Sequence, residues 1–357
     1  MTHWPDMRLC TLLDIEHPII QAPMAGASTP EMASVVANAG GLGSLGCATM
    51  TPEVVLASVS KARNLSNRAL NLNFFCHKAP VNDVARAVSA QDRLQPWFDD
   101  MGIEHMPDAI EGHFPFDAEM CQIVINASPK VVSFHFGLPD ATLVACIKDA
   151  GIKVLSSATS VAEARWLQAH GADAIIAQGY EAGGHNGWFL ARDGGQVAGI
   201  MALVPRIVDA VDCPVIAAGG IADGRGIAAA FALGAAGVQI GTAFLATPES
   251  SVSNIHKQTI VTATGDDTQF SRAFSGRAAR TVVNKYSREM EDVTDWPDFP
   301  IMNTLTGPLR AASAKSGNKD AVALWSGQGV GLVHESTTKH VFDTLIEQAQ
   351  AAFGHNE

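Results

Sequence analysis

The sequence predicts an α/β fold in which about eight parallel strands alternate with helices and close into a (β/α)8 TIM barrel. Short apolar runs recur along the chain, an Ala-rich segment of helical period separates most of them, and these segments end at glycine. Near-continuous apolar strands are typical of a parallel sheet that is buried on both faces. The expected strands are Pro18–Pro23, Gly43–Cys47, Leu70–Phe75, Val131–Phe136, Lys153–Ser157, Ala172–Gln178, Pro214–Ala218 and Gly237–Leu245.

The segments between the strands carry helix start and stop signals. Residues 29–31 (Thr-Pro-Glu) supply an N-cap, a first-turn proline and a first-turn acid, and residues 51–53 repeat this arrangement. Residues 160–163 read as a capping box. Gly40 and Gly171 follow two of these segments, as expected at helix C-termini.

An open, doubly wound sheet is the main alternative, and Gly41, Gly43 and Gly46 match a G-x-G-x-x-G pattern. A dinucleotide-binding fingerprint must follow a strand and open a helix. Here a helical segment precedes the glycines, and the motif runs into a strand. We therefore reject it as a nucleotide loop and favour the barrel.

Composition excludes several classes of function. The chain has 357 residues, of which 47% are hydrophobic and 17% are charged, and its net charge of −12 argues against nucleic acid or an anionic membrane as a partner. Its six cysteines include no C-x-x-C pair, which indicates reduced thiols rather than a disulfide framework or zinc site. The N-terminus has no apolar signal core, and no apolar run approaches membrane-spanning length. We expect a cytoplasmic protein that acts on a small molecule.

Two stretches exceed a minimal βα repeat. Residues 77–128 are rich in aromatic, proline and acidic residues, and we expect them to form an excursion over the barrel mouth after the third strand. Residues 251–357 are too many for one closing helix, so we expect a helical C-terminal region that contains the last barrel helix. The barrel itself is then made of residues 1–76 and 129–250.

Glycines follow the seventh and eighth strands, where barrels of this kind hold phosphate. Gly219 and Gly220 follow the seventh strand, and residues 239–242 (Gln239, Ile240, Gly241 and Thr242) end the eighth. Adjacent glycines let backbone N–H groups approach a phosphate, and Thr242 adds a hydroxyl donor. Although each pair could be a simple tight turn, both together predict a phosphate site.

A histidine framed by glycines follows the sixth strand. His185 comes after Gly183 and Gly184 and precedes Asn186-Gly187, so a loop rather than a helix face holds it. Imidazole has the intrinsic pKa needed for proton abstraction near neutral pH. Glu181 lies four residues before His185, but the intervening glycines disfavour a metal-binding helix face, and we expect no metal.

Four further side chains are expected at the barrel mouth. His135 ends the fourth strand, where it could contact substrate, orient a cofactor or simply pack as a structural residue. The amides of Asn73 and Gln178 end the third and sixth strands and suit a heteroaromatic ring with alternating donors and acceptors. Met24 could lie against such a ring through its thioether, or belong to the core.

These motifs resemble the nitronate monooxygenase family, formerly called 2-nitropropane dioxygenases. The similarity extends from about Ile19 to Leu245 and reappears at residues 324–328. The segments that carry it are residues 21–26 (Q-A-P-M-A-G), 132–139 (V-S-F-H-F-G-L-P), 178–185 (Q-G-Y-E-A-G-G-H) and 217–221 (A-A-G-G-I).

The resemblance implies a barrel that binds FMN non-covalently and oxidises alkyl nitronates, such as propionate 3-nitronate, with dioxygen to a carbonyl compound and nitrite through a flavin semiquinone. It makes His185 the catalytic base and His135 part of the substrate site. Arg310 and Lys315 are candidates, by position, for the cation that steadies the anionic flavin. The implied FMN contacts are Met24, Asn73, Gln178, Gly183, Gly219, Gly220, Gln239, Ile240, Gly241 and Thr242.

Other functions share parts of this pattern. FMN-dependent enoyl-acyl-carrier-protein reductases and NADH:quinone reductases have a similar glycine–histidine loop, although the His135 segment disfavours the former. A flavin-binding protein without catalytic activity is a further alternative, and the intact frame around His185 argues against it.

Overall fold

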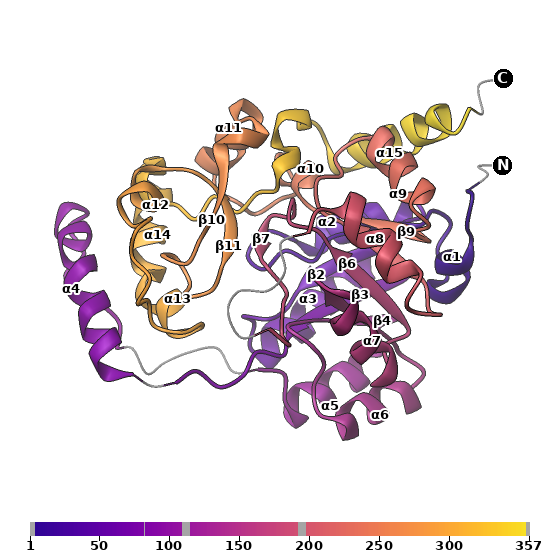
Figure 1. The fold of residues 1–357 in the computed structure, drawn as a ribbon, viewed down its shortest axis with the longest axis horizontal. Coiled ribbons are helices and arrows are strands. Elements are labelled where there is room, and N and C mark those ends of the chain that lie inside the picture. Colours follow the sequence, from indigo (N-terminus) through magenta and orange to yellow (C-terminus); the bar gives the residue numbers. More distant parts are fainter. Residues whose placement is uncertain (1–3, 82, 109–114, 192–197, 355–357) are drawn as a thin grey trace.

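A computed structural model of the chain describes residues 4–81, 83–108, 115–191 and 198–354. Eight parallel strands form one sheet in the order β1-β9-β8-β6-β5-β4-β3-β2, and a parallel bridge between Ile20 and Leu42 joins its two ends. The predicted (β/α)8 barrel is therefore confirmed (Figure 1). The barrel strands are β1 (Ile19–Gln21), β2 (Gly43–Gly46), β3 (Leu70–Phe75), β4 (Val131–His135), β5 (Lys153–Ala158), β6 (Ala174–Gln178), β8 (Val215–Ala218) and β9 (Gly237–Ile240).

Helices surround the barrel, and the predicted caps start two of them. The Thr29 hydroxyl accepts a hydrogen bond from Met32 N, and the Ser160 hydroxyl accepts one from Glu163 N. The last helix packs against both α9 and α2, which closes the ring. The ring comprises α2 (Pro30–Asn38), α3 (Pro52–Leu65), α5 (Ala118–Ala127), α6 (Ala141–Asp149), α7 (Val161–Ala169), α8 (Ile200–Val208), α9 (Gly224–Ala232) and α15 (Thr338–Ala352). The short α1 (Arg8–Leu13) precedes β1.

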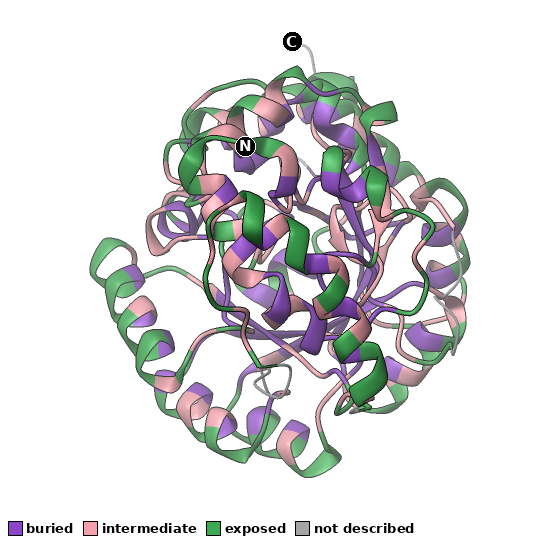
Figure 2. Cartoon of the chain, turned by 90° about the vertical axis from the view of Figure 1, so that its left-hand side faces the viewer, coloured by how far each residue is buried: buried purple, intermediate pink, exposed green. Residues whose placement is uncertain are grey.

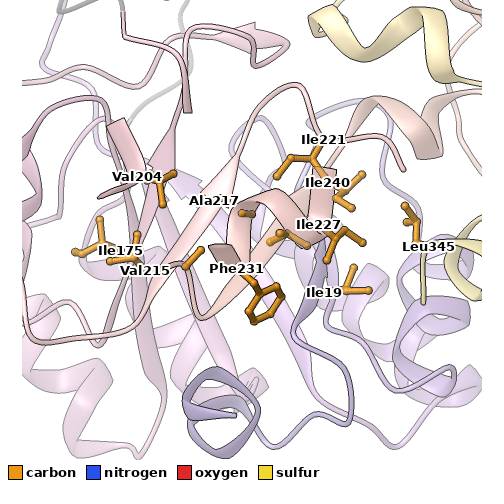
Figure 3. Close-up of a cluster of buried hydrophobic side chains, with 14 of the residues drawn as sticks. Ile19, Ile175, Val204, Val215, Ala217, Ile221, Ile227, Phe231, Ile240 and Leu345 are labelled. Carbon is orange, nitrogen blue, oxygen red and sulfur yellow. The ribbon is translucent and has the colours of Figure 1, made fainter. Parts of the chain in front are cut away.

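The core has two layers, because side chains alternate along each strand. One layer fills the barrel interior and includes Ile20, Leu155 and Ile176. The other lies between the strands and the helices, and Figure 3 shows part of it around Ile227 and Leu345. Buried residues accordingly follow the strands and the inward faces of the helices (Figure 2).

The C-terminal region contains a β-hairpin as well as the expected helices. Strand β10 (Thr268–Ser271) pairs antiparallel with β11 (Ala279–Val282), and β11 pairs with the two-residue strand β7 (Gly184–His185). The hairpin therefore reaches back to the loop that follows β6. The short α10 (Thr242–Leu245) precedes this region, whose other helices are α11 (Asn254–Thr262), α12 (Lys285–Glu289), α13 (Ile301–Leu305) and α14 (Gly307–Ser316), with 3-10 turns at Gly265–Asp267, Lys319–Ala321 and Gln328–Leu332.

The segment predicted as an excursion divides into two parts. Helix α4 (Val84–Asp100) places Ala90, Leu94 and Phe98 in a buried cluster with side chains of the C-terminal region such as Met302. Helix α5 instead packs between α3 and α6 on the barrel. Figure 1 shows α4 beside α12–α14, on the side of the barrel away from α1. Residues 82 and 109–114 of this segment lie outside the described residues.

Among the described residues, no helix combines the length and apolar character that a membrane span requires.

The glycines of the G-x-G-x-x-G match serve close packing. A Cβ on Gly43 would lie 1.9 Å from the carbonyl oxygen of Ala33 on α2, and one on Gly46 would lie 2.5 Å from Ala25 N. Strand β2 can therefore approach α2 and the loop after β1 only where these positions lack side chains.

We expect Gly43→Ala to destabilise the protein by about 1–3 kcal/mol, because an extra methyl group in a packed core forces the backbone to shift. Chemical denaturation monitored by circular dichroism measures this change. Ser60→Ala on the exposed face of α3 is the control and should stay within about 0.5 kcal/mol of the parent. If the two variants are equally stable, the close contact between Gly43 and α2 does not contribute to the free energy of unfolding.

Candidate functional site

A cavity of about 700 Å³ lies at the carboxyl ends of the barrel strands and extends under the C-terminal region. Its volume lies within the range of small-molecule and cofactor sites, and its position matches the active-site face of this fold. All but one of the residues predicted for the site line it, namely Met24, Asn73, His135, Gln178, Gly183, His185, Gly219, Gly220, Gln239, Gly241 and Thr242.

Ile240 is the exception. Its side chain is buried between the strands and the helices, in the cluster shown in Figure 3, while the neighbouring Gln239 faces the cavity. Alternation of side chains along β9 explains the difference.

One end of the cavity is formed by glycines with special geometry. Gly219 and Gly220 have φ values of +119° and +71°, a region that L side chains rarely adopt. A Cβ on Gly183 would lie 2.5 Å from Gly327 N, so these two loops touch through backbone atoms alone. Thr242 Oγ1 accepts a hydrogen bond of 2.9 Å from Gly327 N, which leaves the hydroxyl proton of Thr242 available to a ligand.

Gln239 carries the clearest sign of a missing polar partner. Its Oε1 is buried and has no hydrogen bond to any described residue. A buried amide oxygen without a donor costs free energy, so a ligand that supplies an N–H or O–H there would be favoured. Asn73 is differently placed, because its Nδ2 donates to Ser133 O and Oγ, at 3.2 and 2.9 Å.

His185 projects from β7 at the other end of the cavity. Its Nε2 lies 2.9 Å from Ser275 Oγ, and the Ser275 hydroxyl donates to the carbonyl of Arg277 at 3.1 Å. Because that hydroxyl proton is already engaged, Ser275 accepts from His185, which places the imidazole proton on Nε2. Nδ1 is then the lone-pair nitrogen, the atom that can accept a proton.

The surroundings of His185 keep it uncharged. Burial lowers its pKa to about 3, and the positive charges of Arg277 and Arg310 act in the same direction. Aromatic rings enclose it as well, and those of Phe299 and Trp325 have centroids 5.2 and 5.7 Å from the imidazole. At neutral pH the ring is therefore a neutral hydrogen-bond acceptor in an apolar pocket.

Two of the predicted residues hold the backbone of His185. His135 Nε2 donates to the His185 carbonyl at 3.0 Å, and its Nδ1 accepts from the Ser157 hydroxyl at 2.8 Å. Gln178 Nε2 donates to the same carbonyl at 3.0 Å, and its Oε1 accepts from Gly187 N at 2.7 Å. Burial lowers the pKa of His135 to about 4, so it remains neutral as this pattern requires. Both side chains line the cavity, yet these bonds already fix their orientation.

The hairpin secures the same loop with two arginines. Arg280, 2% exposed, donates through Nε and Nη2 to Tyr180 O and lies over the Tyr180 and Phe270 rings. Arg277 donates to Asn186 O and Trp188 O, and its guanidinium lies 4.0 Å from the centroid of the Phe136 ring. Each end of the loop is thus tied to the C-terminal region.

Glu163 anchors the chain beyond the loop. Its Oε1 accepts from Phe189 N and Leu190 N, at 2.7 and 3.1 Å, and its Oε2 accepts from Thr159 N and Oγ1. The carboxylate therefore joins α7 to the segment after β7 instead of completing the capping box that the sequence predicts at Ser160.

Only one of the two candidate cations from the sequence reaches the cavity. Arg310 on α14 lines it, whereas Lys315, further along the same helix, is exposed and does not. Ser275, Arg277 and the aromatic side chains of Phe75 and Phe299 were not predicted at the site, because they come from separate parts of the chain. Trp325 lies in the segment 324–328 that carries the resemblance, but its place in the aromatic wall was not predicted either.

The chain matches a family model described as nitronate monooxygenase over residues 6–348. It is 39% identical to nitronate monooxygenase from Pseudomonas aeruginosa over 345 residues, which is 96% of this chain and 98% of the relative. It is 38% identical to a probable nitronate monooxygenase from Staphylococcus aureus (strain MRSA252) over 347 residues, which is 97% of this chain and 98% of that relative.

Solved structures agree with this match. A nitroalkane oxidase from Streptomyces ansochromogenes superposes with a TM-score of 0.90 at 36% identity, covering 98% of this chain and all of that one. FabK from Thermotoga maritima gives a TM-score of 0.75 at 31% identity, covering 99% of this chain and 98% of its own. The family predicted from the motifs is confirmed. This chain belongs to the nitronate monooxygenase family of oxidoreductase enzymes.

Proposed function

We propose that this protein is an FMN-dependent nitronate monooxygenase, which oxidises alkyl nitronates such as propionate 3-nitronate with dioxygen to a carbonyl compound and nitrite. The observation that carries the proposal is that a neutral, half-buried imidazole and the paired glycines after β8 line one cavity large enough for a flavin. The family match supports the same reaction.

The residues at the cavity suit FMN. Gly219, Gly220 and Gly241 present backbone without side-chain obstruction, and Thr242 offers a hydroxyl, as a phosphate monoester needs. Gln239 Oε1 lacks a partner and would accept a hydrogen bond from the ligand. The Met24 thioether, 3.4 Å from the position of a Cβ on Gly241, would lie beside the ring system.

FMN, when bound, supplies the electron transfer between substrate and dioxygen, and the protein supplies the acid–base chemistry and the electrostatics. Arg277 adds to the effect of burial in lowering the pKa of His185, and its positive charge would attract an anionic nitronate despite the net charge of −12. Phe75, Phe299 and Trp325 line the cavity and would exclude water from the reacting atoms.

His185 would accept the α-proton of a neutral nitroalkane at Nδ1, while Nε2 stays bonded to Ser275. The abstraction converts the substrate to its nitronate anion and the imidazole to an imidazolium, and the two opposite charges then stabilise each other. A nitronate that is supplied already ionised bypasses this step. His135 and Gln178 would hold the His185 backbone during the transfer.

A reductase that uses NAD(P)H, with a quinone or an enoyl thioester as acceptor, is the second candidate. The similarity to FabK, at 31% identity over 99% of the chain, supports this second candidate. Anaerobic mixing of the flavin-loaded protein with NADH separates the two, because rapid bleaching of the flavin would indicate a reductase. We propose instead that NADH leaves the flavin oxidised, whereas propionate 3-nitronate with air releases nitrite.

We place the reaction in the cytoplasm, where free thiols are normal. All six cysteines are unpaired. The partners in this proposal are the small-molecule nitronate and dioxygen.

Replacing His185 by Asn should separate proton abstraction from oxidation. We expect turnover of neutral nitroethane to fall by about a hundredfold or more, since a positioned base contributes roughly that much, while ethyl nitronate keeps most of its rate. Nitrite release measures both. Equal losses on the two substrates would remove His185 from the proton-transfer step.

The pH profile follows from the pKa of His185. A histidine with a lowered pKa stays deprotonated, and hence active as a base, at any pH above that value of about 3. We expect kcat/KM for freshly dissolved neutral nitroethane to stay level between roughly pH 5 and pH 8 and to fall only in stronger acid. An inflection near the ordinary histidine pKa of about 6.5, absent from His185→Asn, would contradict this environment.

Ser275→Ala removes the acceptor that sets the tautomer of His185. We expect kcat on neutral nitroethane to fall roughly tenfold or more with KM little changed, and ethyl nitronate oxidation to stay near the parent rate. Ser275→Thr keeps the hydroxyl and should restore much of the loss. If both substrates slow together, Ser275 serves folding rather than the imidazole.

A further inference from the structure

One helix face in the C-terminal region forms a wall of the cavity. Gly307, Arg310, Ala311 and Ala314 of α14 all line the cavity, at the spacing of one helix face, and Asn303 of α13 adjoins them. Gly307, Ala311 and Ala314 carry no polar side chain, so Arg310 is the one charged group that α14 offers to the cavity.

Arg310 is held in place by neutral partners. Its Nε donates to Thr306 Oγ1 at 3.1 Å, and its Nη2 donates to Asn303 O and Oδ1 at 2.7 and 3.0 Å. No hydrogen bond occupies Nη1, and no carboxylate forms an ion pair with the guanidinium, within the part of the chain that the structure describes. The guanidinium is thus fixed in orientation and still has donors to offer.

Partial burial makes a cation without an anionic partner costly at this position. The pKa of Arg310 falls to about 10 because of burial, and Arg310 remains charged at neutral pH. A cation removed from water is stabilised most by an anion with matching geometry, and a guanidinium pairs with a carboxylate through two parallel hydrogen bonds. Arg277 cannot take this role, since its guanidinium lies between the Phe136 and Trp188 rings and donates to backbone carbonyls.

The position of Arg310 differs from that of the reacting groups. His185 stands on β7 in an aromatic pocket, whereas Arg310 stands on α14, and both line the same cavity. A substrate whose nitronate lies at His185 and whose chain ends in a second anionic group would occupy both. A simple alkyl nitronate would leave the arginine unpaired.

Building on the proposed function, we propose that Arg310 binds the carboxylate of the substrate and makes the enzyme selective for nitronates that carry one. Asn303 and Thr306 act as positioning residues that hold the guanidinium toward the cavity.

The test compares propionate 3-nitronate with propyl 1-nitronate, which carries a methyl group in place of the carboxylate. In Arg310→Met we expect kcat/KM for propionate 3-nitronate to fall by on the order of a hundredfold, mainly through KM, as for loss of a charge-assisted hydrogen-bonded pair. Propyl 1-nitronate should change by less than about threefold. Equal losses on both substrates would overturn the proposal and place Arg310 at the nitronate or the flavin.

Two further variants serve as controls for the loss of charge and for the geometry of the guanidinium. Lys315→Met removes an exposed cation from the same helix and should leave both substrates at the parent rates. Arg310→Lys keeps the charge but not the planar fork, and should lose part of the selectivity for propionate 3-nitronate without losing folding. Arg310→Lys also provides the test if Arg310→Met does not fold. If Arg310→Lys then prefers propionate 3-nitronate over propyl 1-nitronate as strongly as the parent does, the proposed pairing through two parallel hydrogen bonds is contradicted.

A binding readout keeps this inference separate from the proposed function. Titration of the flavin-loaded protein with propionate should perturb the flavin absorbance in the parent and in Lys315→Met, and only at much higher concentration in Arg310→Met. If the parent oxidises no nitronate but shows this dependence, the proposed function fails and the carboxylate site stands. Binding of propionate that is equally strong in Arg310→Met refutes the site, whatever the activity.

Discussion

The arrangement of the site depends on how the chain holds the main-chain carbonyl of His185. That oxygen accepts hydrogen bonds from His135 and Gln178, which end strands of the barrel, while β7 pairs with β11 of the hairpin. The barrel and the C-terminal region thus fix one two-residue strand from opposite sides. Since the imidazole has few ways to turn when its backbone and its Nε2 are both engaged, the proton-accepting nitrogen is defined before any substrate arrives.

The charge around the site is opposite in sign to the net charge of the chain. The chain is acidic, yet three arginines, Arg277, Arg280 and Arg310, lie around the loop and the cavity, with carbonyl oxygens and aromatic rings as their partners instead of ion pairs. A carboxylate partner would cancel their field, while a carbonyl or a ring leaves most of it in place. The field of Arg277 and Arg310 adds to the effect of burial in keeping His185 neutral, and it makes the cavity attractive to anions.

Local patterns in the sequence were enough for the barrel. Apolar runs, proline-assisted N-caps and terminal glycines are each encoded within a few residues, and the strands lie where these patterns place them. The run from Gly237 was too long, because Thr242–Leu245 turn into a short helix after Gly241. Ile240 was predicted as an FMN contact together with its neighbours, but strand alternation turns its side chain away from the cavity and directs Gln239 there.

The parts that sequence reasoning missed depend on distant contacts. Ser275 contacts His185, and Arg277 contacts Asn186 and Trp188, across about ninety residues. Both come from a hairpin whose strands have four residues, which is too short for alternation to be recognised. His135 and Gln178 lie at the mouth as expected, but the bonds that both donate to one carbonyl depend on how distant strands meet in the fold. The sequence indicated only where Arg310 lies along the chain. Its place at the cavity depends on the packing of α14, which lines the cavity.

The tautomer and charge of His185 are the most direct test of this account. Nitrogen-15 NMR of the flavin-loaded protein with labelled histidine, assigned by comparison with His185→Asn, reports both. We expect a neutral ring protonated at Nε2 that persists from neutral pH down to about pH 5. A ring that is protonated at Nδ1, or that takes up a second proton near the ordinary histidine pKa, would contradict the orientation and the buried environment on which the proposed chemistry rests.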